Sequence, residues 1–347
     1  MKSKYYDGTK LLAKRDLDDN VPEIYICTGN RTAGKSYFFK KFLTMNFVHD
    51  NTQKIMVIYR RRDEMHDAIN AFFGDIKHDK EISKLLEFKY ESKTEMSGTY
   101  QTWYLNGVEM GFAVYLNGAE KIKRASGRFV DVKWILFDEI QSETHSYVDD
   151  EVNKFISIHI SVARGHGEQT RYVPCILIGN TTSLVNPYFR ALKIHDRYTP
   201  SAKFMRGQGW VAEFAHNESA EEAIKASAFN RAFASSNYVG YAAENNYLLD
   251  NTNFVEKRNL SGAMFLYHFV YEGKHIGGWY LPEGIFYFSA RHDPSEKPIA
   301  LIKEDHTKET LYRFINIEKL RQFYDRGNIR FETLEISNTI VEYLLKI

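Results

Sequence analysis

Residues Gly29-Asn30-Arg31-Thr32-Ala33-Gly34-Lys35-Ser36 fit the pattern GxxxxGK(S/T) at every fixed position. The apolar run Ile24–Cys27 precedes them, and a helix is predicted to follow over Ser36–Val48. A strand before the loop and a helix after it form the context that a phosphate-binding loop requires. All the residues of this loop are therefore predicted to bind a nucleotide.

The residue types of the loop suit a triphosphate with a metal ion. Glycines let successive backbone N–H groups point at phosphate oxygens, and the start of a helix adds a favourable dipole. Lys35 is predicted to bridge the β- and γ-phosphates and to assist catalysis, while the Ser36 hydroxyl ligates Mg²⁺. Arg31 either touches phosphate or is a solvated loop residue. ATP and Mg²⁺ are the expected ligands.

A second predicted strand, Trp134–Phe137, ends in two carboxylates, Asp138 and Glu139. Asp138 is predicted to hold Mg²⁺, directly or through water. Glu139 is predicted to orient and polarise the attacking water. An acidic pair at the end of a strand is common, but it becomes specific after a phosphate-binding loop. The second carboxylate favours hydrolysis over transfer to an acceptor, as in a kinase.

A further buried strand, predicted over Cys175–Ile178, runs into Gly179-Asn180-Thr181-Thr182. A polar side chain at the end of a central strand can sense the γ-phosphate. Asn180 is the first candidate for this sensor and Thr181 is the second. The alternative for Asn180 is an ordinary turn residue.

An amphipathic helix is predicted over Asp150–Ala163, and Arg164 follows it. An arginine at a helix end, before a Gly-containing loop, suits an arginine finger that stabilises charge in the transition state. The alternative is a surface arginine that the helix dipole favours. Arg171 is the competing candidate.

Composition excludes several classes of protein. The chain has 347 residues, 46 Lys+Arg and 45 Asp+Glu, and its length predicts two domains. Two cysteines, each within an apolar run, argue against a disulfide scaffold and for buried reduced thiols in a cytoplasmic protein. No apolar stretch is long enough for a membrane span, so no membrane partner is expected. The 12 His show no metal-ligand spacing, and surface or packing roles are expected.

Strands that alternate with helices predict an α/β fold with a mainly parallel sheet. We expect a P-loop ATPase domain over 1–210, a helical linker over 211–247 and a smaller α+β domain over 248–347. The linker contains a predicted helix, Ser219–Ala234, with a capping box from Ser219 to Glu222. Hairpins and then helices over Ile317–Asp325 and Leu334–Leu345 are predicted for the last domain.

A basic segment, Glu120–Arg128, precedes the acidic strand and could form a loop that grips DNA phosphates. Its cationic side chains are Lys121, Lys123, Arg124 and Arg128. Lys121 and Lys123 are the preferred contacts. The alternative is a solvated basic loop.

Together these residues resemble the genome-packaging ATPases of small short-tailed double-stranded DNA phages, the type that uses a packaging RNA. Four segments carry the likeness: GNRTAGKSY at 29–37, ILFDE at 135–139, Ala163-Arg164 through IGNTTSLVNPYF at 178–189, and ARHDPS at 290–295. The VNPYF and HDPS strings are more diagnostic than the loop. They disfavour a helicase loader or a kinase. The alternative function is that of another P-loop NTPase, such as a phage helicase loader or a non-packaging DNA-dependent ATPase.

The resemblance implies a ring, expected to be a pentamer, on the portal of a preformed capsid in the host cytoplasm. ATP hydrolysis would drive double-stranded DNA inward. The resemblance also implies the additional-strand, catalytic-glutamate branch of P-loop ATPases, with Arg164 acting on a neighbouring subunit. The last domain resembles an RNase H-like nuclease that has lost its metal centre, so a docking role without nuclease activity is expected.

Two positions depart from the family pattern. Asp63 stands at the apparent position of a lysine that some relatives have, so a role for Arg62 in its place is open. The N-terminal segment lacks the glutamine with which relatives can read adenine. Tyr5 or Tyr6 could stack on the base instead.

Overall fold

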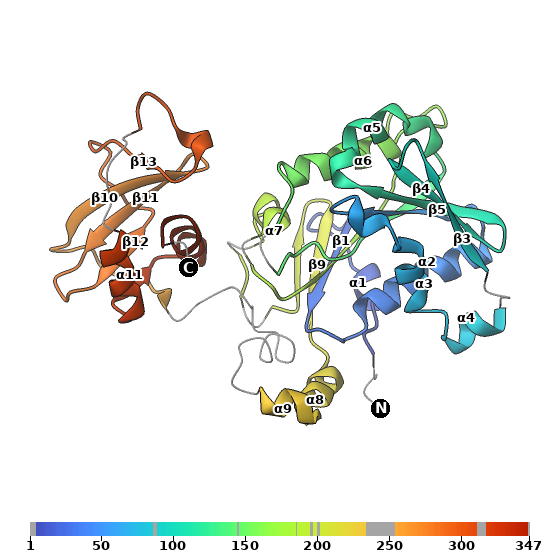
Figure 1. Ribbon diagram of the computed structural model, residues 1–347, viewed down its shortest axis with the longest axis horizontal. Coiled ribbons are helices and arrows are strands. Elements are labelled where there is room, and N and C mark those ends of the chain that lie inside the picture. The colour runs from blue at the N-terminus through green and yellow to red at the C-terminus, as the bar shows by residue number, and fades with distance from the viewer. Residues whose placement is uncertain are drawn as a thin grey trace. The chain divides into compact units, whose positions relative to one another are not determined.

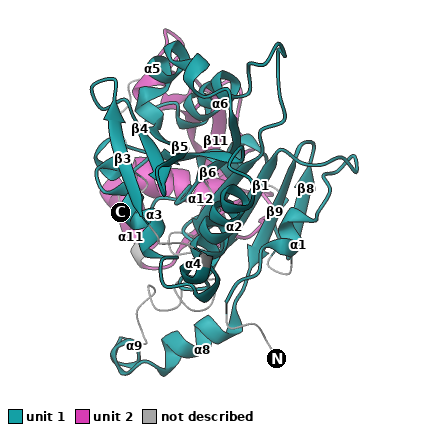
Figure 2. Ribbon diagram, turned by 90° about the vertical axis from the view of Figure 1, so that its right-hand side faces the viewer, with its two compact units in different colours: residues 1–248 teal, residues 249–347 magenta. Residues whose placement is uncertain are grey.

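The computed structural model describes residues 5–85, 89–143, 146–184, 186–194, 197–199, 202–233, 254–310 and 317–345. The chain divides into two compact units, Met1–Leu248 and Leu249–Ile347 (Figure 2). Two units agree with the two domains expected from length. No helix among the described residues is long and apolar enough to cross a bilayer.

The described strands of the first unit form one nine-stranded sheet in the order β3-β4-β5-β2-β6-β7-β1-β9-β8 (Figure 1). The six adjacent strands β5, β2, β6, β7, β1 and β9 pair in parallel with one another. Strands β3 and β4 at one side of the sheet and β8 at the other side pair antiparallel. The mainly parallel α/β sheet predicted from the sequence is confirmed. The strands are β1 Ile24–Gly29, β2 Lys54–Tyr59, β3 Tyr90–Glu95, β4 Tyr100–Leu105, β5 Val108–Tyr115, β6 Val132–Phe137, β7 Cys175–Asn180, β8 Phe204–Gly207 and β9 Trp210–Ala215.

Helices cover both faces of this sheet because the central strands are apolar on both sides. On one face, Phe39 and Leu43 of α2 and Phe72 of α3 share a core with inward side chains of β1, β2 and β7. On the other face, Phe137 of β6 packs on Phe155 of α6. The helices are α1 Thr9–Leu12, α2 Lys35–His49, α3 Ala68–Gly74, α4 Lys80–Leu85, α5 Ala119–Arg124, α6 Glu151–Val162, α7 Pro187–Ala191, α8 Glu218–Ala226 and α9 Ala228–Ala232.

The structure corrects the predicted boundary at residue 210. Strand β9 begins at Trp210 and pairs in parallel with β1, so residues 210–215 belong to the sheet and not to a linker. The predicted linker helix is two helices, α8 and α9, because Ser227 has an extended backbone between them. The remainder of the predicted linker, from residue 234 to 247, lies outside the described residues.

The predicted capping box at the start of α8 is wrong. The N-cap is Asn217, whose side-chain oxygen accepts a hydrogen bond from the backbone N–H of Ala220 at 3.0 Å. Ser219 therefore lies inside the helix. Asparagine is as good an N-cap as serine, so local sequence alone did not separate the two.

The second unit is a mixed sheet of five described strands in the order β13-β10-β11-β12-β14. The predicted hairpins are confirmed, since β10, β11 and β12 pair antiparallel in sequence order. Phe269, Phe288 and Phe331 lie in its core. Its elements are β10 Met264–Tyr271, β11 Lys274–Tyr280, β12 Phe286–Ser289, β13 Ile299–Ala300, α11 Ile317–Asp325, β14 Ile329–Phe331 and α12 Leu334–Thr339, with a π-helical turn over Ile340–Leu345.

Candidate functional site

The loop between β1 and α2 depends on its two glycines. A Cβ on Gly29 would lie 2.0 Å from the carbonyl oxygen of Ala215 in β9, so only glycine fits this close approach. Gly34 precedes α2 with a φ of 92°, in the left-handed region that favours glycine. The backbone thus curls from the carboxyl end of β1 directly into the first turn of α2.

Lys35 lies buried inside this curl. Its Nζ donates to the carbonyl oxygens of Gly29 at 2.8 Å and Asn30 at 2.7 Å, and it is 3.3 Å from Oδ1 of Asn180. Burial lowers the pKa of Lys35 to about 8. A positive charge held by neutral oxygens in a buried loop is well placed to exchange those partners for phosphate oxygens.

Asn180 reaches the loop because β7 lies beside β1. Gly29 and Asn180 are partners in the parallel register of these strands, so the predicted sensor lies next to the lysine. Thr181, the second candidate, is buried, and no partner of its hydroxyl is found among the described residues. Both predicted sensor residues therefore lie at the carboxyl edge that carries the loop.

The acidic pair follows β6 at this same edge. The backbone N–H of Glu139 donates to Oδ1 of Asp138 at 3.0 Å, and Glu139 has a φ of 63°. Loss of surrounding water and then the charges of Asp138 and Glu64 raise the pKa of Glu139. A left-handed backbone at a residue other than glycine persists only where its surroundings impose it, and such strain gathers at functional sites.

Arg60 and Glu151 hold the acidic turn in place, and sequence reasoning did not assign them this role. Arg60 is buried after β2 and donates to the carbonyl oxygens of Glu139 at 3.0 Å and Ile140 at 3.1 Å. Its Nε also donates to Oε2 of Glu151, the first residue of α6, at 2.9 Å. Such buried, charge-assisted bonds fix the turn geometry. Arg60 and Glu151 are 91 residues apart in the sequence, so no local sequence pattern could reveal this pair.

The residues at this edge fit a magnesium ion. Oδ2 of Asp138 is 3.9 Å from Nζ of Lys40, and Lys40 is one helical turn beyond Ser36. A serine hydroxyl and a carboxylate are therefore on neighbouring surfaces of α2 and β6. Mg²⁺ prefers such oxygen ligands and takes its remaining ligands from water and phosphate. The hydroxyl of Thr181 is buried and has no hydrogen-bond partner among the described residues. It is a further polar group that a ligand or water can bind.

Two other loop residues have protein partners. Arg31 pairs with Glu143 beyond the acidic turn at 2.9 Å. Asn30 exchanges two hydrogen bonds with the backbone of Asn217: its Nδ2 donates to the Asn217 carbonyl at 3.1 Å, and its Oδ1 accepts from the Asn217 N–H at 3.0 Å. Because Asn217 caps α8, the loop is tied directly to the start of that helix.

Arg164 lies at the opposite edge of the sheet. It is exposed just after α6, where its Nε donates to the Ile160 carbonyl at 3.0 Å. Helix α6 has 12 residues and begins at Glu151, beside the acidic turn. The backbone of Arg164 is therefore about 18 Å along the helix axis from the start of α6 beside the acidic turn of its own chain, at about 1.5 Å per residue.

The competing Arg171 has a structural role. Its guanidinium donates to the carbonyl oxygens of Val132 at 3.3 Å and Val162 at 2.7 Å, which joins β6 to α6. A guanidinium occupied in this way is a poor finger. The exposed Arg164 is the better candidate.

The basic segment 120–128 is helical, which corrects the predicted loop. Residues 119–124 form α5, and a 3-10 turn follows over 126–128. Lys121, Lys123 and Arg124 are exposed, whereas Arg128 is paired with Glu109. Arg128 also stacks over Phe112 at 4.9 Å, so it serves the fold. Helix α5 packs on α6 (Figure 1).

The N-terminal segment covers the loop. The N–H of Tyr6 donates to the Ala33 carbonyl at 2.8 Å, and the Tyr6 hydroxyl donates to Glu213 at 2.6 Å. The Tyr5 ring is exposed and lies 5.9 Å, centroid to centroid, from the ring of Tyr37. Tyr5 is thus the better placed of the two for stacking on a base. Arg62 donates to the Ser97 carbonyl at 2.9 Å, in the turn between β3 and β4.

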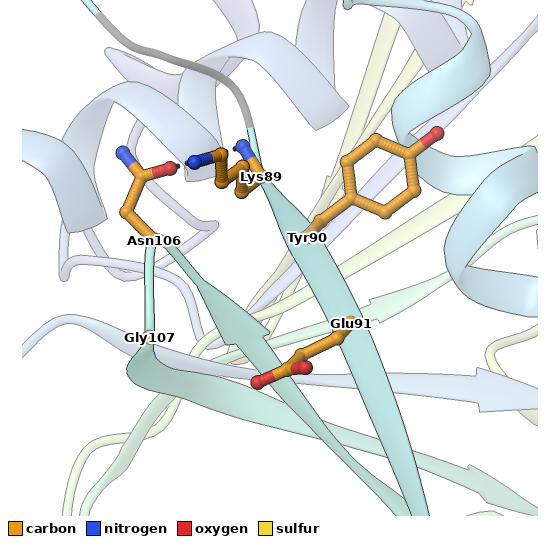
Figure 3. Close-up of a pocket in the computed structure, with 5 residues that line it drawn as sticks. All are labelled: Lys89, Tyr90, Glu91, Asn106 and Gly107. Carbon is orange, nitrogen blue, oxygen red and sulfur yellow. Dashed lines mark hydrogen bonds between the residues drawn. The ribbon is translucent and has the colours of Figure 1, made fainter.

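A cavity of about 500 Å³ lies elsewhere, at the edge strand β3. Figure 3 shows its lining, with the Asn106 amide turned toward Lys89; Oδ1 of Asn106 accepts from the Lys89 N–H at 3.0 Å. None of the predicted site residues lines this cavity. The candidate site is therefore the carboxyl edge of β1, β6 and β7.

A parallel sheet with this loop after its first strand and an acidic pair after β6, with β7 between the two strands, defines a protein of the P-loop ATPase fold class. The family model for the podovirus DNA encapsidation protein (Gp16) matches residues 1–347. The chain belongs to that family.

Particular relatives agree along the whole chain. The DNA packaging proteins of Bacillus phages phi29 and PZA are each 25% identical over 354 residues, covering 99% of this chain and 98% of theirs. The fold is similar to a chain of the bacteriophage Phi-29 viral genome packaging motor assembly, with a TM-score of 0.65, 22% identity and 98% coverage of both chains. It is also similar to the Phi-28 gp11 DNA packaging motor, with a TM-score of 0.56, 15% identity, and coverage of 99% and 98%.

Proposed function

We propose that this protein hydrolyses ATP to translocate double-stranded DNA into a preformed capsid. The observation that carries the proposal is the meeting of Lys35, Asn180 and the Asp138–Glu139 turn at one sheet edge in a chain of the DNA encapsidation family. Lys35 would hold the β- and γ-phosphates, Ser36 and Asp138 would hold Mg²⁺, and Glu139 would orient the attacking water. Bound Mg²⁺ would neutralise phosphate charge that develops during hydrolysis.

Arg164 would complete the site of a neighbouring subunit in a ring. Its position at the edge opposite to the loop supports action between subunits, because it does not reach the site of its own chain. The protein would work as a homo-oligomer, a pentamer by resemblance, on the portal at the capsid vertex in the host cell, with a packaging RNA as a further partner. The second unit would dock this assembly without nuclease activity.

Two contacts offer a route from nucleotide to DNA. Asn180 touches Lys35 and would respond to loss of the γ-phosphate. Asn30 binds the residue that caps α8, so movement of the loop would reach α8 directly. Mobile lysines and arginines would grip the DNA backbone whatever its sequence, as a translocase requires. The exposed cations of α5 are the candidates for this grip.

The test is ATP hydrolysis by the full chain with and without double-stranded DNA, beside the Glu139→Gln variant. Hydrolysis that DNA stimulates and Glu139→Gln abolishes is the expected result. Hydrolysis that ignores DNA even on portal-bearing capsids would favour another P-loop enzyme, such as a helicase loader. Absence of hydrolysis on such capsids would overturn the proposal.

A further inference from the structure

Three histidines converge in the second unit, outside the proposed ATPase site. His268 lies in β10, His275 lies in β11 and His292 follows β12. Their ligand nitrogens all lie within 4.8 Å of one another. The ring centroids are 4.5 Å apart for His268 and His292, 4.9 Å for His275 and His292, and 5.0 Å for His268 and His275. This corrects the expectation of scattered histidines without a ligand pattern.

The fold builds this cluster from two directions. In the hairpin register, Val270 pairs with His275 and His268 pairs with Gly277, so the two histidines are diagonal neighbours on one face. The chain after β12 then crosses over Gly277, where a Cβ would lie 2.1 Å from the Arg291 carbonyl oxygen. Trp279 holds this crossing, because its Nε1 donates to the same carbonyl at 2.9 Å. His292 is thereby brought against the hairpin.

Hydrogen bonds to backbone carbonyls set the proton positions on two of the rings. Nδ1 of His268 is 2.5 Å from the Glu296 carbonyl oxygen, and Nδ1 of His292 is 3.1 Å from that of Ala290. A carbonyl can only accept, so each Nδ1 carries the proton and each Nε2 keeps a lone pair. Histidines that ligate metals are commonly oriented by such a bond from the other ring nitrogen.

His275 completes the set. Its Nδ1 lies 2.8 Å from Nε2 of His268, so one proton joins the two nitrogens when no ion is bound. A metal ion can take the place of this proton if the proton moves from Nδ1 to Nε2 of His275. The two ligand nitrogens must then separate by about half an ångström, since Zn–N bonds are about 2.0–2.1 Å. His275 is exposed, which leaves this side open to an incoming ion.

We propose that His268, His275 and His292 bind one Zn²⁺ ion, with water in the remaining coordination position. Three imidazoles and an open position are a donor set that Zn²⁺ accepts, whereas Mg²⁺ prefers oxygen. The ion would cross-link the β10–β11 hairpin to the segment after β12. It would therefore stabilise the second unit, independently of nucleotide.

The alternative is a stack of three histidines that packs without an ion. Burial and then the charges of His292 and His275 lower the pKa of His268, against the hydrogen bond to Glu296, which raises it. The two alternatives differ in a measurable way, because only one of them takes up zinc.

The experiment uses the untagged full chain, stripped with a chelator and titrated with Zn²⁺ by calorimetry in Mg²⁺ buffer. One equivalent should bind, and Co²⁺ in its place should give the visible absorption of a nitrogen-ligated ion. His275→Ala and His292→Ala should each weaken Zn²⁺ binding by roughly tenfold or more. The matched control is His306→Ala, an exposed histidine of the same unit outside the cluster, which should bind as the wild type does.

His275→Ala keeps the test valid because this exposed side chain supports no core, and circular dichroism checks its fold. Zinc should raise the melting temperature of the wild type and of His306→Ala, but not that of His275→Ala. Failure of the stripped wild type to bind Zn²⁺, or binding that both cluster variants retain in full, would overturn the proposal. Neither outcome depends on ATP hydrolysis, so the proposed motor function is tested separately.

Discussion

Glu139 combines the features expected of the group that orients the attacking water. It follows the metal-binding candidate Asp138, its backbone is left-handed, and Arg60 holds its carbonyl oxygen. Its raised pKa makes its carboxylate a stronger base than a solvated glutamate. Arg60 and Glu151 are thus positioning residues, which hold the backbone of Glu139.

Glu139→Gln should bind ATP as the wild type does but hydrolyse it about 10²–10⁴ times more slowly, because the amide cannot take a proton from water. Nucleotide binding by fluorescence and phosphate release together measure this. Glu91→Gln, on the edge strand β3, is the matched control and should leave both unchanged. A Glu139→Gln variant that hydrolyses at the normal rate would remove Glu139 from the mechanism.

If Lys35 binds the phosphates as proposed, nucleotide affinity should depend on pH. Burial lowers the pKa of Lys35 to about 8 in the nucleotide-free protein, whereas bound phosphates favour the charged form and raise it. Binding above pH 8 therefore takes up a proton. Apparent ATP affinity should be flat below about pH 8 and fall by up to about tenfold per pH unit above it.

A fluorescent ATP analogue titrated at several pH values measures this slope. Lys35→Arg is the control, because its guanidinium stays charged throughout and its affinity should not change with pH. A wild-type affinity that stays constant well above pH 8 would show that the lysine is not deprotonated there.

At the scale of single elements, α5 presents its cations on defined faces. Ile122 and Ala119 are its buried residues, so Lys121 and Arg124, one turn apart, lie away from that face. Lys123 lies nearer to the buried side. A helix therefore favours Lys121 with Arg124 as the DNA-contacting pair, where the sequence favoured Lys121 with Lys123.

Replacing Lys121 and Arg124 by alanine should weaken DNA binding at every sequence and reduce the salt slope by about one per lost phosphate contact. The double variant Lys121→Ala with Lys123→Ala should reduce the salt slope less. Binding of a short duplex at several salt concentrations separates the two double variants. Equal slopes for both and for the wild type would place the DNA grip elsewhere.

Asn217 caps helix α8 and also bonds the phosphate-binding loop. Asn217→Ala should destabilise the start of α8 by about 1 kcal/mol through loss of the N-cap. Amides of its first turn should then exchange about fivefold faster with solvent, as hydrogen exchange reports. Ser219→Ala is the control and should have little effect; the reverse result would restore Ser219 as the cap.

At the scale of the whole molecule, the proposed ATPase site requires that a second copy supply Arg164. Arg164→Ala and Glu139→Gln subunits, each inactive alone, should regain activity when mixed on portal-bearing capsids. At an interface between the two kinds, an intact Glu139 meets an intact Arg164. Phosphate release measures the recovery.

Glu139→Gln mixed with Lys35→Ala is the control, because both changes fall in the same site and no interface is then complete. Recovery in this control as well would point to subunit exchange with contaminating wild type. Full activity of Arg164→Ala alone would reject the finger assignment.

Contiguous patterns by themselves determined the phosphate-binding loop at 29–36, the strand that ends at Phe137 and helix α11 at Ile317–Asp325. These features depend on neighbouring residues, whose periodicity and turn chemistry are visible in the chain. The sequence patterns also placed Asp138 and Asn180 at the ends of strands. Parallel strands bring their carboxyl ends to one edge of the sheet. The class of protein and the position of its candidate site were therefore predictable.

Only the tertiary structure decided which distant residues meet. It paired Arg60 with Glu151 and Asn30 with Asn217, added β9 to the sheet, and gathered His268, His275 and His292. Each contact joins residues separated by 7 to 187 positions, and no periodic pattern links the members. Strand register, close backbone crossings and helix ends set these distances, and those arise only when the sheets have formed.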